Sequence, residues 1–148
     1  MQPNRGSVEQ LSWERACPAA ITSDVLWKLD AYRAAMFLLH LSEADGRAIS
    51  ARHPDDDIAR QLRRAAGSIG ANLGEGYSRP TRADRLRFLS YALGSARECL
   101  VWYQAASDVL PARGCEHRLH LLMRIRSLII GVIRSNRERA PAAATFEP

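Results

Sequence analysis

The stretch Gln61–Arg79, QLRRAAGSIGANLGEGYSR, decides the fold of this 148-residue chain. Its four glycines suit either a phosphate-binding loop or a helix that another helix approaches closely. A phosphate loop lies between a strand and a helix, and a P-loop ends in Lys-Ser or Lys-Thr. Neither a strand pattern nor a lysine accompanies these glycines. Because glycine costs about 1 kcal/mol in a helix interior, we interpret them as helix-packing positions. They are Gly67, Gly70, Gly74 and Gly76.

Apolar residues recur at helical intervals of three and four through four segments, and no segment alternates as a strand does. The first segment is expected to end at Gly46, and Thr81 with Asp84 forms a variant of the capping box at the start of the third. The pattern predicts an all-α fold, an antiparallel up-down four-helix bundle. The expected parts are an N-terminal arm (1–21), a bundle (22–138) with helices at about 23–44, 56–77, 81–108 and 115–137, and a disordered C-terminal tail (139–148).

Composition limits the class of protein. A chain of this length that is 47% hydrophobic can bury one sizeable core. No apolar run is long enough to span a bilayer, and the N-terminus lacks the pattern of a signal peptide, so we expect a cytoplasmic protein. Three cysteines without CxxC spacing, Cys17, Cys99 and Cys115, are expected to be free thiols.

Positive charge is concentrated in one part of the chain. The net charge is +5, and Lys28 is the only lysine among 21 basic residues. Residues 60–97 hold eight arginines against two acids, which is more than the whole net charge. A ridge of arginines suits a phosphate backbone, although a solvated face enriched in arginine is the competing interpretation. The candidate nucleic-acid-binding residues are Arg60, Arg63, Arg64, Arg79, Arg82, Arg85 and Arg87.

Polar residues share a face of the same predicted helix. Gln61 begins this stripe, and the next helix offers matching positions beside Gly94. Two carboxylates inside a bundle need hydroxyl, amide or arginine partners, so the pattern favours an internal structural network. Its expected members are Ser68, Asn72, Glu75, Ser95 and Glu98.

The sequence offers little for catalysis or metal binding. A carboxylate metal site in a bundle uses Glu-x-x-His, which does not occur here. His117 and His120 form a short pair near the start of the fourth helix, with no further ligand evident. We expect no metal, no cofactor and no enzymatic activity; a hidden active site at Glu75 and Glu98 is the weakest alternative.

Two motifs resemble a known family. The segments RRAAGSI (63–69) and NLGEG (72–76), followed by Phe88, ALGS (92–95) and Glu98, resemble the signatures of bacterial proteins encoded in intervening sequences of 23S rRNA genes. The accessory variability proteins of diversity-generating retroelements are similar in fold. The match runs from Leu26 to Arg134, and Gly74 stands where the family usually has alanine.

This resemblance implies a homopentameric barrel of four-helix bundles with basic surfaces, and no catalytic activity is established for such proteins. For members tied to retroelements, the resemblance implies that the protein binds RNA or DNA and associates with a reverse transcriptase. Two functional hypotheses therefore stand: a nucleic-acid-binding accessory protein, and a protein-interaction scaffold without a direct nucleic-acid role.

Overall fold

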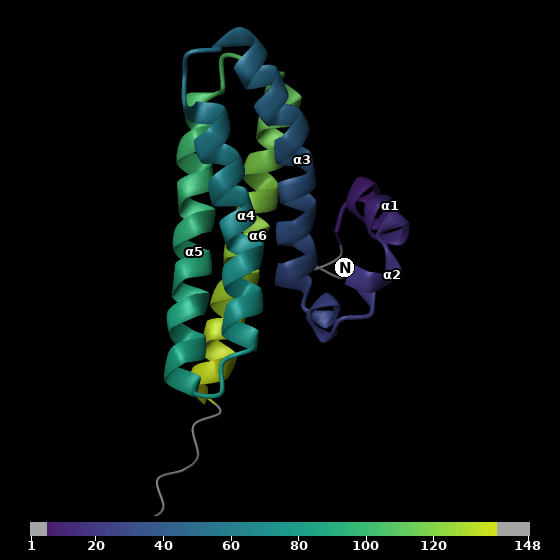
Figure 1. Ribbon diagram of the computed structural model, residues 1–148, viewed down its shortest axis with the longest axis vertical. Coiled ribbons are helices and arrows are strands. Elements are labelled where there is room, and N and C mark those ends of the chain that lie inside the picture. The colour runs from purple at the N-terminus through teal and green to yellow at the C-terminus, as the bar shows by residue number, and fades with distance from the viewer. Residues whose placement is uncertain (1–5, 139–148) are drawn as a thin grey trace, which may run out of the picture.

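Four long helices lie side by side in the computed structural model, which describes residues 6–138 (Figure 1). They are α3 (Asp30–Arg52), α4 (Ile58–Tyr77), α5 (Arg82–Ala105) and α6 (Ala112–Glu138). Helix α4 packs between α3 and α5, and α6 contacts both α5 and α3, so the four helices enclose a common interior. We call α3–α6 the helical body. The described residues contain helices and no strand, which confirms the predicted all-α class.

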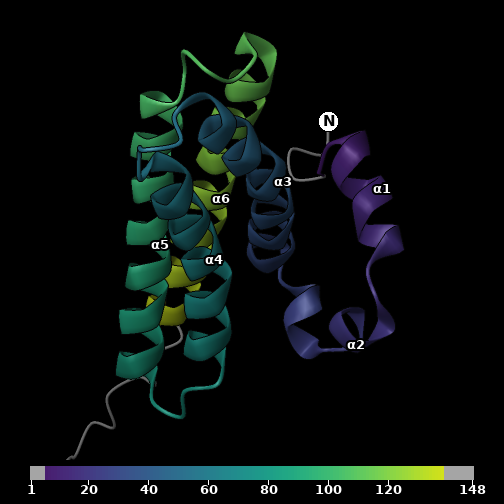
Figure 2. The same cartoon turned by 45° about the horizontal axis from the view of Figure 1, so that its top comes forward.

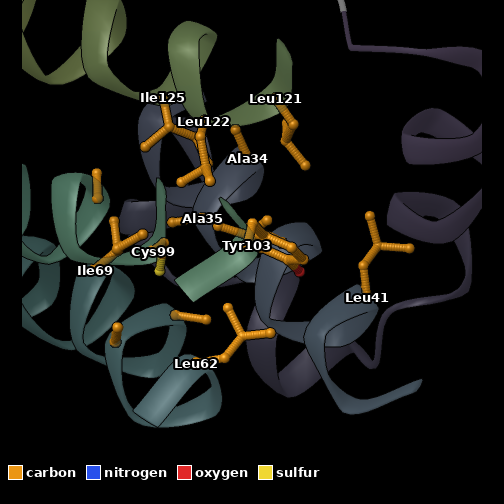
Figure 3. Packing of buried hydrophobic residues seen from close by; sticks show 14 of the residues in the cluster. Ala34, Ala35, Leu41, Leu62, Ile69, Cys99, Tyr103, Leu121, Leu122 and Ile125 are labelled. Carbon is orange, nitrogen blue, oxygen red and sulfur yellow. The ribbon is translucent and has the colours of Figure 1, made fainter. Parts of the chain in front are cut away.

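The core fills the space between these helices. Leu62 and Ile69 of α4, Tyr103 of α5, and Leu122 and Ile125 of α6 are all fully or almost fully buried (Figure 3). Burial of each large apolar side chain contributes about 1.5–3 kcal/mol, so this interior is the main source of stability. Within the described chain, no helix is both long and apolar enough to cross a membrane.

The last three predicted helices agree with the structure to within about one turn, whereas the first does not. The expected helix 23–44 is wrong at both ends, since α3 covers Asp30–Arg52. Residues Val25–Lys28 instead form a short 3-10 helix, η1, in which Asp24 accepts a hydrogen bond from the Leu26 amide at 2.8 Å. The Arg33 guanidinium donates to the Trp27 carbonyl at 2.5 Å and holds this break in place.

Gly46 does not end α3. It is buried inside the helix, and a Cβ added there would lie 3.1 Å from Cδ of Arg63. The glycine therefore lets the Arg63 side chain cross α3 closely, and its effect is on packing between helices and not on chain direction.

The segment predicted as an N-terminal arm contains two helices, α1 (Val8–Ala16) and α2 (Ala19–Thr22), on the outer side of α3 (Figures 1 and 2). Ser7 caps α1 by accepting from the Gln10 amide at 3.1 Å. Trp13 packs against Phe37 of α3, with ring centres 5.5 Å apart. The buried Gln10 side chain accepts a hydrogen bond from Arg124 of α6 at 2.9 Å. The predicted tail 139–148 lies outside the described residues.

The glycines of α4 differ in how closely they are packed. At Gly76 an added Cβ would lie 3.1 Å from Cβ of Phe88 and 3.4 Å from the Arg85 carbonyl oxygen. At Gly70 the nearest atom would be the Met36 sulfur at 3.5 Å, which is ordinary contact. Close helix approach therefore requires glycine at Gly76, where α4 meets α5.

Candidate functional site

The seven predicted arginines form two groups at opposite ends of α4. Arg63 and Arg79 are sixteen residues apart, so their backbones are separated by about 24 Å along the helix axis. The first group, Arg60, Arg63 and Arg64, lies at the N-terminal end of α4. The second lies at the turn between α4 and α5, and we call it the arginine turn: Arg79, Arg82, Arg85 and Arg87.

Acidic residues largely neutralise the first group. Arg60 donates two hydrogen bonds of 2.5 Å to the Asp57 carboxylate, which lowers the pKa of Asp57 and raises that of Arg60. Arg63 lies 3.9 Å from Glu43. Of these three arginines, only the exposed Arg64 has no ion pair among the described residues. This end of α4 is therefore a weak candidate for phosphate binding.

The arginine turn keeps more of its positive charge. Residues 75–87 carry four arginines against two acids, Glu75 and Asp84. Arg79 pairs with Glu75, and Arg87 pairs with Asp84 at 2.9 Å. Both guanidinium groups also lie over the Phe88 ring, at 4.8 and 5.6 Å from its centre. This cation–π geometry holds the two charged groups together beside the turn.

The other two arginines face the end of α6. Arg82 is exposed, and its Nη1 lies 3.4 Å from the Arg137 carbonyl oxygen. Arg85 is partly buried; its Nε is shielded from solvent and has no hydrogen-bond partner within residues 6–138. The Nε of Arg79 is shielded and without a hydrogen-bond partner in the same way, and such donors are costly, so packing does not fully explain either arginine.

A pocket of about 380 Å³ opens beside Arg85. The turn between α4 and α5 lies at the lower end of the helical body in Figure 1. The apolar wall of the pocket comes from three of the long helices, α4, α5 and α6, and from the residue just before α3. Three polar side chains complete it: Tyr77 of α4, Arg85 of α5 and Asn136 of α6. The apolar residues are Leu29, Leu73, Gly76, Leu89 and Val132.

The predicted polar network forms in part. Asn72 Nδ2 donates to Ser68 Oγ at 2.9 Å, and the two serine hydroxyls of Ser68 and Ser95 are 2.9 Å apart. Ser95 Oγ in turn donates to the Tyr91 carbonyl at 3.0 Å. Because Ser95 uses its one proton on that carbonyl, Ser68 donates to Ser95, and the hydrogen bonds run in one direction from α4 to α5.

The two glutamates do not join this network. Glu75 is exposed and pairs with Arg79, whereas Glu98 is exposed and accepts from Trp102 Nε1 at 3.2 Å. The expectation of an internal pair of carboxylates is therefore wrong. Both side chains lie on the surface, where water solvates the charge and no buried partner is needed. Gln61 donates to Asp57 at 3.0 Å and is also separate.

A buried polar cluster that the sequence did not indicate lies at the opposite end of the helical body. The Tyr103 hydroxyl donates to Asp45 Oδ2 at 2.8 Å, and Arg118 donates to both oxygens of that carboxylate, at 2.9 and 3.2 Å. Burial, together with the nearby Asp45 charge, raises the pKa of Tyr103. Burial opposes the charged form of Arg118, but the hydrogen bonds to Asp45 and the attraction of its negative charge together outweigh burial, so the pKa of Arg118 is also raised. Tyr103 and Arg118 are 58 and 73 residues away from Asp45 in the sequence, so no local pattern reveals these contacts.

The three cysteines are free thiols. Burial raises the pKa of Cys99 to about 12, so this thiol is protonated and inert at neutral pH. Within the described chain, no three histidine, cysteine, aspartate or glutamate side chains are placed to hold a metal ion. His117 instead lies 2.9 Å from Arg118, beside the buried cluster.

These features define the class of the protein: it is all-helical among its described residues, with a basic turn and a small pocket beside that turn. Residues 29–118, more than half of the chain, match the family of 23S rRNA-intervening sequence proteins. The chain belongs to this family, which confirms the resemblance seen in the two motifs.

A solved structure supports the same fold. A crystal structure of a protein with unknown function from the S23 ribosomal protein family of Bacteroides thetaiotaomicron superimposes with a TM-score of 0.66. The two chains are 21% identical, and the match covers 70% of this chain and 98% of that one. At this identity the likeness concerns the fold alone. No curated protein matches the chain at a significant level.

Proposed function

We propose that this protein is a non-enzymatic, oligomeric nucleic-acid-binding accessory protein whose helical body is an antiparallel four-helix bundle. The observation that carries the proposal is the arginine turn, in which Arg82 and Arg85 have no acidic partner among residues 6–138. Guanidinium groups bind phosphate oxygens through paired hydrogen bonds, and they release counterions from a nucleic-acid backbone. Basic side chains on rigid helices can therefore hold a backbone without reading its sequence.

The family supports RNA as the first nucleic acid to examine, since its name refers to 23S rRNA. The resemblance to accessory variability proteins supports a second setting, in which the protein assists a reverse transcriptase of a diversity-generating retroelement. The proposal includes a cytoplasmic location in either case.

Salt dependence of binding tests this function. We expect the affinity for a labelled RNA stem-loop to fall steeply as salt rises, because each neutralised phosphate adds about 0.7–0.9 to the slope of log K against log salt. Arg87→Gln and Arg82→Gln should each reduce that slope by about one phosphate contact. Arg64→Gln is the matched control, since Arg64 is an exposed arginine at the other end of α4. Absence of binding at low salt, or equal losses in all three variants, would refute the assignment to the arginine turn.

A specific observation also favours protein–protein contact. Tyr91 and Val101 of α5 are 51% and 59% exposed, and Met123 of α6 is 57% exposed. Large apolar side chains on two neighbouring helices suit a surface that another protein covers. We propose that copies of this chain cover it, in the homopentamer that the family resemblance implies, or that a partner such as a reverse transcriptase does so in a scaffold role.

Light scattering on the purified protein tests the assembly. A pentamer has a molar mass five times the 16.5 kDa of one chain. Val101→Glu should lower the measured mass if α5 lies between copies, whereas Glu116→Gln, on the exposed surface of α6, should not. A pull-down of reverse transcriptase that survives nuclease and high salt would favour the scaffold function over nucleic-acid binding.

A further inference from the structure

The pocket beside the arginine turn has features that phosphate binding alone does not require. A phosphate contact needs exposed guanidinium groups, whereas this pocket of about 380 Å³ is walled by leucine and valine side chains. Its volume is at the small end for ligand pockets, so it suits one planar ring system better than a peptide or a lipid chain.

The polar groups at the pocket match the edges and the faces of a nucleobase. Tyr77 is 52% exposed and offers an aromatic face on which a base can stack. Asn136 Nδ2 is engaged, since it donates to the Val132 carbonyl at 2.9 Å, while its Oδ1 accepts no hydrogen bond from residues 6–138. The shielded Nε of Arg85 is a donor without a partner in the same part of the chain. Asn136 and Arg85 both line this pocket, so an amide acceptor and a guanidinium group stand at its apolar wall.

The surroundings of the pocket supply contacts for the rest of a strand. Tyr77 ends α4 two residues before Arg79, and Arg85 belongs to the arginine turn itself. A backbone held by Arg79, Arg82 and Arg87 would therefore pass directly beside the pocket. In a duplex the bases are paired and stacked, so they cannot enter it, whereas an unpaired base can turn out of the strand.

We propose that this pocket receives an unpaired base, and that the protein binds single-stranded nucleic acid in preference to a duplex. This inference rests on the proposed function, because the arginine turn holds the phosphates on either side of the base. The site is formed by Tyr77, Arg85 and Asn136, and it adds recognition of single strands to a backbone contact that would otherwise accept any nucleic acid.

Three probes of equal length test the inference by fluorescence anisotropy with the full chain at low salt. They are a single-stranded oligonucleotide, its duplex, and an abasic strand that keeps the phosphates and lacks the bases. We expect the single strand to bind about tenfold or more tighter than the other two, the size of effect that one base–aromatic stack supports. Equal binding of all three would overturn the pocket and leave the proposed function standing. Binding of none of them would overturn both.

Variants locate the effect. Tyr77→Ala should weaken binding of the single strand about tenfold and leave binding of the abasic strand unchanged. Val25→Ala is the control, because Val25 is similarly exposed, at 46%, and lies outside the pocket. Equal losses in the two variants would overturn the assignment to the pocket. A 2-aminopurine placed in the strand gives a second readout, since its fluorescence should be quenched by the native protein and recover in Tyr77→Ala. Unchanged quenching in that variant would also count against the inference.

Discussion

The hydrogen bond from Tyr103 to Asp45 makes a sharp test of how the helical body is held together. Tyr103 is fully buried, and its hydroxyl is one of three donors to the Asp45 carboxylate; Arg118 provides the other two. Tyr103→Phe removes that donor without changing the volume of the ring. A hydrogen bond to a charged group contributes about 1.5–3 kcal/mol, so we expect the free energy of unfolding to fall by about 2 kcal/mol.

Urea unfolding followed by far-UV circular dichroism measures this loss. The midpoint should fall at an unchanged slope, and for a chain of this size the melting temperature should drop by about 4–8 °C. All variants are compared at one protein concentration, because assembly adds to apparent stability. Tyr91→Phe is the control: this tyrosine is half exposed on the same helix, so its change should stay within about 0.5 kcal/mol.

A second variant separates the ion pair from the hydrogen bond. Arg118→Met leaves the Asp45 carboxylate buried without its counter-charge, which should cost about 3–5 kcal/mol. Because both side chains act on one carboxylate, the double variant should depart from the sum of the two single losses. If Tyr103→Phe were as stable as Tyr91→Phe, or if the two losses simply added, the cluster would not be the joint between α3, α5 and α6 that its geometry indicates.

Three more tests use the same unfolding assay or a simple extension of it. Gly94→Ala should raise stability by about 1 kcal/mol, because nothing lies within 4 Å of the added Cβ. Gly76→Ala should lower stability, since atoms of α5 lie 3.1 and 3.4 Å from the added Cβ. Stability changes of the same sign in the two variants would contradict this account. Stability should fall above about pH 9, because the pKa of Cys99 is raised to about 12 and the pKa of Tyr103 is also raised, so the unfolded chain loses these protons first. The folding equilibrium constant should drop about tenfold per pH unit for each group between its unfolded and folded pKa, and Cys99→Ala should remove the first part of the drop. Gln10→Ala should release α1 by removing its hydrogen bond to Arg124. We expect faster amide hydrogen exchange in Val8–Ala16 and unchanged exchange in the rest of the chain. Equal protection of α1 in the variant and the native protein would refute this role.

The part of the fold that the sequence predicts is the part that local signals determine. Helix α4 begins within two residues of its predicted start and ends at its predicted end. Thr81 caps α5 as expected, because it accepts from the Asp84 amide at 3.1 Å and donates to the Asp84 carboxylate at 2.7 Å. These features depend on residues three and four apart, so a single stretch of sequence is enough to find them.

The first helix shows why the rest could not be predicted. Asp45 and Gly46 look like a helix end, since both residue types are poor helix formers and common in turns. In the structure Asp45 binds side chains from α5 and α6, and Gly46 lies under the Arg63 side chain of α4. Tertiary contacts thus outweigh the local preference, and none of these partners is near in sequence.

The two ends of the helical body differ in a way that stability alone does not explain. At one end the buried Asp45 carboxylate has three donors, which is what a folded protein needs when it buries a charge. At the other end Arg79 and Arg85 each keep a shielded Nε without a hydrogen-bond partner in the described chain, and a pocket that no side chain fills lies beside Arg85. An unsatisfied donor lowers stability, so consistency of the fold would favour a carboxylate or an apolar residue there. Arg82 and Arg85 also have no acidic partner among residues 6–138, and in the proposed function a phosphate-bearing strand with an unpaired base supplies both the negative charge and the ring that this end of the protein lacks.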